Sequence, residues 1–453
     1  MRTRISSPIL TICATATFLA SILAAAPASA GPLLDKAIAY SDNWQERHGV
    51  GYGCRVETVW ADESQTVPVR YEDIGDAVSW TGPYVGAESL RWHVTRDPQA
   101  KINARRGLEC LLAAEAVTSK PGFVVRSVTP FEGPWAAYVG DTCEPTNNCH
   151  PITDGPYAGA YWLGNTSSDT YIGWFYGMLL TSEFLLDEPG DADTRAAVSG
   201  AVERVMDALI ADDYLIVLPD GNPSDTAPEI TGNERIAFHE VAARVVGGRF
   251  ADMMPAVYQR ELFAYLLSTW APFNTYFQYF AYNLGHTLQH TILLADSPNP
   301  DFDRYVTREN LYRWVAGSQQ SFFDFVAWGE GAASYTDADV AADRAVLNAV
   351  PYPPRLAIQP TQGAYTPDPV VDLLNFLGPI IAELIGLPGG WDEISPKATE
   401  PFPPGERCVV GFMWDNNPAN VCGGSNPVFE YAGDDYLIAY WLGRYYGLLS
   451  AAD

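Results

Sequence analysis

The chain has 453 residues and a formal net charge of −28, with 55 acidic residues against 27 Lys and Arg. This excess of negative charge repels nucleic acids and other polyanions, which argues against such partners. After the first thirty residues no apolar run is long enough to span a bilayer, and P-loop and dinucleotide motifs are absent. We therefore expect no nucleic-acid partner, no membrane span and no cofactor.

The first thirty residues read as a signal peptide. Arg2 and Arg4 precede the apolar stretch 9–25, and Ala28-Ser29-Ala30 is a small-residue cleavage site. The sequence therefore predicts a protein that is exported to the extracellular space or periplasm and cleaved near Ala30.

The six cysteines beyond this peptide indicate disulfides, because an even number is typical of exported chains. Six cysteines allow fifteen connectivities. Short loops favour two pairs and elimination leaves a third: Cys143–Cys149, Cys408–Cys422 and Cys54–Cys110. The alternative for Cys110 is a free thiol buried on a helix.

Most of the chain after residue 80 has helical periodicity. Pairs of predicted helices, each an apolar or aromatic helix followed by an amphipathic one, fall at 82–95 with 99–118, 170–186 with 194–213, and 276–294 with 307–325. A less regular pair covers 235–247 and 255–270, and one more helical segment covers 370–386. Residues 48–79 and 123–165 read as short strands and loops.

A short repeat supports this organisation. The segment DTYIGWFYG (169–177) aligns without gaps on DYLIAYWLG (435–443), and WTGPYVGAESL (80–90) is a looser copy. Gly173 and Gly177 share one helix face, so we expect neighbouring helices to approach closely there.

The helix pairs and the repeated D-x-x-I-[GA]-[WY]-[FW]-x-G resemble the six-hairpin (α/α) toroids of secreted carbohydrate-active enzymes. The resemblance covers most of 80–450, although only about five hairpins are distinct, and it names no single family. It implies an all-α, (α/α)6-type toroid in one domain, 31–453, with loop-rich insertions at 123–165 and 387–433. It also implies a cleft lined by acids and aromatic residues where the inner helices begin.

Asp169 and Asp435 are candidate catalytic acids, since both precede matching apolar helices. Two carboxyl groups flanking a glycosidic bond are the minimum for its hydrolysis. The alternative is helix capping, which Asp also performs.

Glu88 is a third candidate acid. Tyr84, Glu88, Arg91 and Trp92 share one face of helix 82–95, as a sugar-binding wall would require. The alternative is a buried Glu88–Arg91 pair that orders the core.

Glu330 is the fourth candidate acid. It lies in a glycine-flanked loop with Trp328 and Tyr335 nearby, which could stack on a sugar. The alternative is an acid that is merely solvated.

Tyr282, Asn283, His286 and His290 carry a different chemistry. Asn, His and Tyr are also the equipment of toroidal polysaccharide lyases, which this resemblance includes. The HxxxH spacing by itself is a weak metal signal, because no third ligand is evident. Core or capping histidines are the alternative.

The composition favours a glycan ligand, because 13 Trp, 25 Tyr and 19 Phe accompany the acids. We expect a secreted, monomeric glycoside hydrolase that cleaves a neutral or weakly charged polysaccharide; the alternatives are a lyase and a non-catalytic glycan-binding protein. The predicted substrate-binding residues are Trp80, Tyr84, Arg91, Trp92, Tyr171, Trp174, Tyr282, Asn283, His286, Trp328 and Tyr335.

Overall fold

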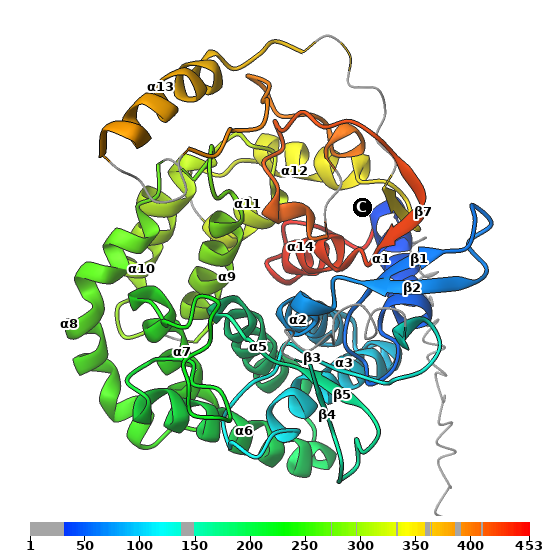
Figure 1. Cartoon of the computed structure of the whole chain (residues 1–453), viewed down its shortest axis with the longest axis vertical. Helices are drawn as coiled ribbons and strands as arrows, with labels where there is room; N and C mark the ends of the chain where they lie inside the picture. Colours follow the sequence, from blue (N-terminus) through cyan, green and yellow to red (C-terminus); the bar gives the residue numbers. More distant parts are fainter. Residues whose placement is uncertain are drawn as a thin grey trace, which may run out of the picture.

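The computed structural model describes residues 31–453 except 137–148, 273, 296, 332–333, 358–362, 364, 386–390 and 409–410. The described part is mostly helical, with small antiparallel sheets, and this confirms the helical class expected from the periodicity (Figure 1). The predicted signal peptide and Cys143 lie outside the described residues.

Helices that contact one another in chain order form the centre of the molecule (Figure 1). They are α2 (Ala77–Thr95), α5 (Ser168–Leu180), α7 (Gly232–Val245), α9 (Phe280–Leu294), α11 (Ser321–Trp328) and α14 (Asp434–Tyr445). Each packs against the next, and α14 packs against α2. Their apolar sequences follow from this position, since α2, α5 and α14 are buried along most of their length.

A second set of helices covers these central helices (Figure 1). It consists of α1 (Pro32–Asn43) on α14, α3 (Pro98–Ala116) on α2, α6 (Ala192–Ala211) on α5 and α7, α8 (Arg249–Thr269) on α7, α10 (Pro300–Tyr305) on α9 and α12 (Asp337–Ala349) on α11. The helix α13 (Pro369–Ile385) lies at the periphery and exposes several large apolar side chains.

Glycines bring α2 and α5 into backbone contact, as the repeat predicted. A Cβ on Gly173 would lie 2.0 Å from the Ser79 carbonyl oxygen, and one on Gly82 would lie 1.8 Å from the Gly173 oxygen. A Cβ on Gly177 would lie 2.9 Å from the Gly82 Cα. No larger residue fits between the two helices without moving them apart.

Two sheets lie beside the helices. The first has the strand order β2-β1-β7-β6, and the second has the order β3-β5-β4. Their bounds are β1 Glu57–Trp60, β2 Pro68–Glu72, β3 Ser127–Thr129, β4 Cys149–Pro151, β5 Tyr161–Leu163, β6 Arg355–Ala357 and β7 Asn426–Tyr431. The first sheet therefore joins the segment before α2 to the segment before α14.

Two of the three predicted disulfides are present. Cys54 is bonded to Cys110, and Cys408 is bonded to Cys422. The first bond excludes a free thiol at Cys110. The pair Cys143–Cys149 stays a prediction.

The two ends of the described chain lie together. The Gly31 N–H donates to the Ala451 carbonyl oxygen at 3.1 Å, and the Leu33 N–H donates to the Asp453 oxygen at 3.1 Å. The helix α1 thereby supplies the outer partner that α14 needs.

Several predicted helix boundaries are wrong. The helix predicted over 82–95 begins at Ala77, so Pro83 lies within α2 and not at its start. The predicted helix 307–325 is interrupted between Trp314 and Ser321, where Gly317 and Gln319 have positive φ. Across the described residues, none of the helices combines the length and apolarity that crossing a bilayer requires.

Candidate functional site

Three adjoining cavities open where α2, α5 and α9 begin. The central cavity, of about 330 Å³, is lined by Asp76, Trp80, Asp169, Phe280 and Asp415, together with Ser79 and Leu284. The sheet-side cavity, of about 460 Å³, shares Asp76, Trp80 and Asp415 with it. The loop-side cavity, of about 300 Å³, shares Phe280 and Asp415. We call the three together the cleft.

The acids of the central cavity come from three separate segments. Asp76 immediately precedes α2, Asp169 is the second residue of α5, and Asp415 ends a short 3-10 helix, Met413–Asp415. The three carboxyl groups converge because α2 and α5 pack closely and the loop carrying Asp415 folds over their ends.

The loop that carries Asp415 is anchored on α14. The Met413 N–H donates to the Asp435 carboxylate at 2.7 Å, and the Trp414 indole donates to the Asp435 carbonyl oxygen at 2.8 Å. Asn283 on α9 donates to the Asp415 carboxyl group at 2.8 Å. These bonds hold Asp415 at the point where all three cavities meet.

The environment of these acids favours their protonated forms. Burial raises the pKa of Asp415 well above its ordinary value, and the charges of Asp76, Asp169 and Asp73 add to the shift, although the Asn283 hydrogen bond opposes it. Burial, then Asp73, raises the pKa of Asp76 to about 6. Burial also raises the pKa of Asp169, against the attraction of Arg126. Neighbouring carboxyl groups that cannot all ionise are typical of acid–base sites.

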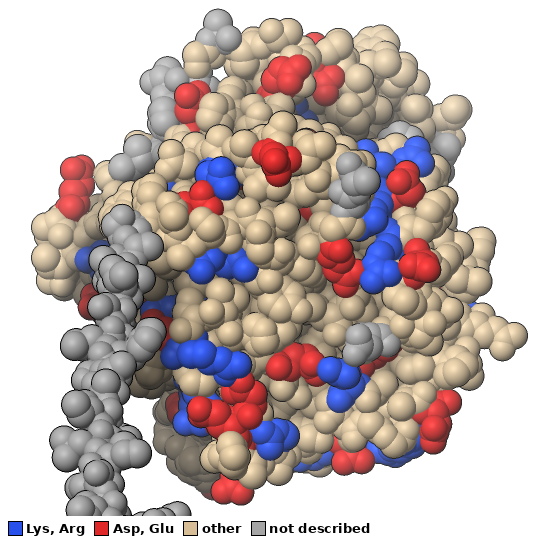
Figure 2. All heavy atoms as spheres, turned by 180° about the vertical axis from the view of Figure 1, so that it is seen from behind, with Lys and Arg blue, Asp and Glu red and all other residues tan. Residues whose placement is uncertain are grey.

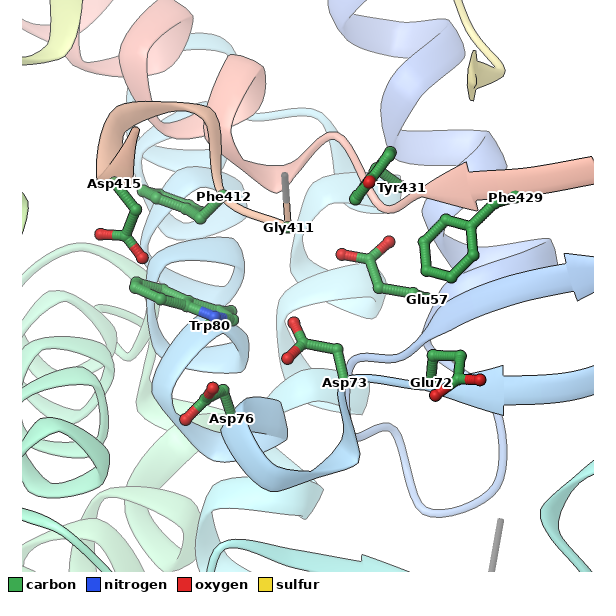
Figure 3. Close-up of a pocket in the computed structure, with 10 residues that line it drawn as sticks. All are labelled: Glu57, Glu72, Asp73, Asp76, Trp80, Gly411, Phe412, Asp415, Phe429 and Tyr431. Atoms are coloured by element: carbon green, nitrogen blue, oxygen red, sulfur yellow. The ribbon is translucent and has the colours of Figure 1, made fainter. Parts of the chain in front are cut away.

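Aromatic side chains form the walls of the cleft (Figure 3). Trp80 stacks on Phe412 with ring centroids 4.5 Å apart and an interplanar angle of 4°. Phe429 and Tyr431 from β7 lie across the sheet-side cavity from this stack (Figure 3). Phe280, 44% exposed, borders the central and loop-side cavities.

Of the residues predicted from sequence, three meet in the cleft. Asp169 and Trp80 line it, and Asn283 reaches it through its bond to Asp415. The N-cap of α5 is Ser167, with no side-chain capping hydrogen bond, and Asp169 lies in the first turn of the helix.

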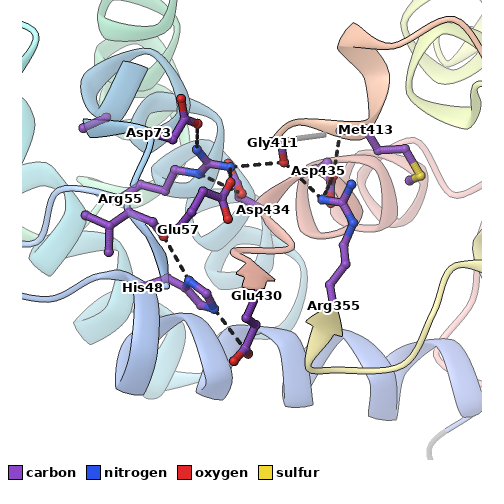
Figure 4. A network of polar contacts seen from close by, with 12 residues as sticks. His48, Arg55, Glu57, Asp73, Arg355, Gly411, Met413, Glu430, Asp434 and Asp435 are labelled. Carbon is purple, nitrogen blue, oxygen red and sulfur yellow. Dashed lines mark hydrogen bonds and ion pairs between the residues drawn. The ribbon is translucent and has the colours of Figure 1, made fainter. Parts of the chain in front are cut away.

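Asp435 is placed differently from its repeat partner Asp169. It is fully buried and forms an ion pair with Arg355 of β6 (Figure 4). Its carboxylate also accepts the Met413 N–H described above. It therefore supports the loop carrying Asp415 without lining the cleft.

Glu88 and its face of α2 lie in the core. Glu88 accepts a hydrogen bond from Ser41 at 2.5 Å and pairs with Arg91 at 3.2 Å, and burial raises its pKa to about 7. Tyr84 stacks on a buried tryptophan, and the Trp92 indole donates to Asp187 at 3.1 Å. The Glu88–Arg91 contact is therefore the buried pair given above as the alternative to a sugar-binding wall.

The remaining residues of α9 also face the core. Tyr282 donates to the Ala271 oxygen at 2.6 Å, and His286 stacks on Phe323. Burial lowers the pKa of His286 and of His290 to about 3, so both are neutral. Two α5 residues, Tyr171 and Trp174, are likewise buried and bonded to backbone atoms.

Glu330 lies at the other end of α11, where it pairs with Arg304 at 2.6 Å. Trp328 and Tyr335 line a separate cavity of about 310 Å³ there, and their rings stack 6.3 Å apart.

Figure 2 shows the side of the molecule opposite to Figure 1, where acidic and basic side chains lie intermingled.

Sequence reasoning missed Asp73, Asp76 and Asp415. Asp76 stands directly before an apolar helix, much as Asp169 stands in the first turn of one, but the predicted start at residue 82 left Asp76 in a loop. Asp415 lies in the predicted insertion 387–433, where nothing in the pattern distinguishes it from other loop acids.

The described residues contain no group of three or more His, Cys, Asp or Glu side chains suited to hold a metal ion. Comparison with known proteins assigns no family: no family model, no curated protein and no solved structure matches the chain. The function must be argued from the cleft alone.

Proposed function

We propose that the protein is a glycoside hydrolase and that the cleft is its active site. The observation that carries this proposal is the convergence of Asp76, Asp169 and Asp415 on one cavity bounded by the Trp80–Phe412 stack. Carboxyl groups beside an aromatic wall match the needs of glycosidic hydrolysis, in which one group protonates the leaving oxygen and another activates water or attacks the sugar.

The environments of the acids support different roles for them. Asp415 is the general acid in this proposal, because burial and three neighbouring acids keep it protonated. Asp169 is the base or nucleophile, because Arg126 offsets part of the effect of burial and favours its ionised form. Asp76 lines the same cavity, and burial raises its pKa to about 6, so in this proposal it exchanges protons with the other two acids.

The proposal extends to the architecture and the compartment. The succession of contacts from α2 through α14 and back to α2, each central helix with an outer partner, supports an (α/α)6 toroid with the cleft at one end. Two disulfides are consistent with export, which the first thirty residues predict.

The lyase alternative has less support. Tyr282 and His286 are bonded within the core, which leaves Asn283 as the one member of that trio at the cleft. The acids of the cleft would also repel a uronate.

The proposal is tested on a panel of polysaccharides. Each reaction is scored for new reducing ends and for unsaturated products, which absorb in the ultraviolet. Hydrolysis releases reducing ends without that absorbance, a lyase yields both, and a glycan-binding protein yields neither. With the substrate identified, Asp415→Asn should lower the rate by about 10²- to 10⁴-fold. Glu330→Gln is the matched control, since Glu330 lies outside the cleft. Full activity of Asp415→Asn would refute the assignment.

A further inference from the structure

The sheet-side cavity has more carboxyl groups than the proposed reaction requires. Its lining includes Glu57, Glu72, Asp73, Asp76 and Asp415, and no Lys or Arg among the described residues lines it (Figure 3). A hydrolase needs two carboxyl groups, so this cavity holds more carboxyl groups than the chemistry uses.

Glu57 provides the most specific feature of the cavity. Its side chain is 1% exposed, and its Oε1 atom forms an ion pair with Arg55. Its Oε2 atom has no hydrogen-bond partner. In Figure 3 the carboxylate extends from β1 toward the space between Asp73 and Tyr431. A buried acceptor without a donor is costly, and a ligand that donates there would remove the cost.

Arg55 is shared among several of the acids beside the cavity, and Arg355 lies over the ring of Tyr431. Arg55 is paired with Glu57, Asp73 and Asp434 at once, so one guanidinium faces three carboxyl groups (Figure 4). The second oxygen of Asp434 is also without a hydrogen-bond partner. A positive charge brought into the cavity would favour the ionised forms of these carboxyl groups and pair with them.

The walls of the cavity indicate the shape of the group that carries this charge. Trp80 on Phe412 forms one side and Phe429 with Tyr431 the other, and the volume of about 460 Å³ is in the range of small-ligand pockets (Figure 3). Aromatic walls suit the apolar C–H face of a pyranose ring, whereas the acids suit an ammonium group.

We propose that the sheet-side cavity is a subsite for an amino sugar with a free, protonated amine, whose ammonium group donates to Glu57 Oε2. This inference rests on the proposed function in taking a sugar as the ligand. It names the substrate class as a cationic aminoglycan, in place of the neutral or weakly charged polysaccharide that the composition suggested.

The test compares two probes of equal length, a glucosamine tetramer with free amines and its fully N-acetylated counterpart, by calorimetry on the wild-type protein. One charge-assisted hydrogen bond predicts about 10- to 100-fold tighter binding of the free-amine tetramer, reduced by added salt. Equal binding of the two tetramers, or tighter binding of the acetylated one, overturns the proposal. Tetralysine is a third probe, and binding as tight as that of the glucosamine tetramer would overturn recognition of the sugar ring.

Variants locate the preference. Glu57→Gln keeps the shape and should lower the preference about tenfold. Because this change also removes a partner of Arg55, Glu72→Gln at the cavity rim is a second variant, and it should lower the preference about twofold. Glu183→Gln is the control. Glu183 lies beyond the end of α5, outside this cavity, and pairs with Arg244, so the change should leave the preference for the free-amine tetramer unaltered. A preference that survives both cavity variants overturns the assignment to this cavity.

The outcomes separate this inference from the proposed function. A free-amine preference without hydrolysis of any polymer supports the subsite and refutes the hydrolase. Hydrolysis of a neutral polymer without the preference supports the hydrolase and refutes the subsite.

Discussion

The beginnings of α5 and α14 have matching sequences and different surroundings. Asp169 and Asp435 occupy the second position of their helices, in segments that align without gaps. Asp169 borders a cavity, whereas Asp435 is covered by the loop before it and paired with Arg355. The same motif therefore supplies a candidate catalytic group at one position and a structural anchor at the other, and the difference comes from what folds over each helix end.

The largest expected effect is on catalysis at the α5 position. Asp169→Asn should reduce hydrolysis about 10²- to 10⁴-fold, because it removes the ionised partner of Asp415. Thermal unfolding should be nearly unchanged, because the substitution also removes one charge from a crowded acidic site. A large loss of stability with normal activity would reverse the comparison.

At the α14 position the expected effect is on stability. Asp435→Asn removes the buried charge that pairs with Arg355 and weakens the bond to Met413, so the free energy of unfolding should fall by about 3 to 5 kcal/mol. Chemical denaturation of this variant beside Asp169→Asn measures the contrast directly. Equal stability of the two variants would show that Asp435 does not anchor the loop.

The acid before α14 and the acid before α2 should respond to falling pH with opposite signs. Burial would raise the pKa of Glu430, before α14, but His48, Asn43 and Arg47 outweigh it and hold the pKa at about 2. Its stabilisation is present above pH 4.5 and is lost as the pH falls toward 2, by about 3 kcal/mol.

Asp76 at the cleft has a raised pKa of about 6, so it favours the folded state below pH 3.8 and loses that contribution as the pH rises to 6. The size is less than about 1 kcal/mol, since its side chain is 42% exposed. The free energy of unfolding can be measured from pH 2 to 7 for Glu430→Gln and for Asp76→Asn. Each variant should lose the pH dependence of stability in the range where its missing carboxyl group titrates. A variant that keeps the wild-type pH dependence in its own range would contradict the pKa shift of the residue it replaces.

A further comparison between α5 and α14 concerns the glycines of the repeat. Gly173→Ala should destabilise by about 1 to 3 kcal/mol, because the new Cβ would meet the α2 backbone. The aligned position in α14 is Ala439, where Ala439→Gly should cost only about 1 kcal/mol through helix propensity. Denaturant midpoints of the pair test whether close packing is specific to the α2–α5 contact. Equal costs would mean that propensity alone decides both.

The helical class and the close contact of α2 with α5 could be predicted from the sequence, because periodicity and paired glycines are local signals. Asp169 and Trp80 could be found for the same reason, since both stand near the start of an apolar helix. Asp415 could not, because its importance depends on a loop folding across the ends of α2 and α5. Asp435 and Glu88 could not be separated from catalytic acids, because only their partners, Arg355 and Arg91, distinguish them.

The bonds that join Gly31 and Leu33 to Ala451 and Asp453 also bear on how the chain folds. The helix α1 finds its partner α14 only across a separation of about four hundred residues, so this contact is far from local. Closing so long a loop has an entropic cost that must be met before the contact between α1 and α14 contributes any stability. The helix α2 packs against α14, and the loop that carries Asp415 is bonded to Asp435 of α14. The cleft should therefore assemble late, after residues 434–453 have docked beside α1.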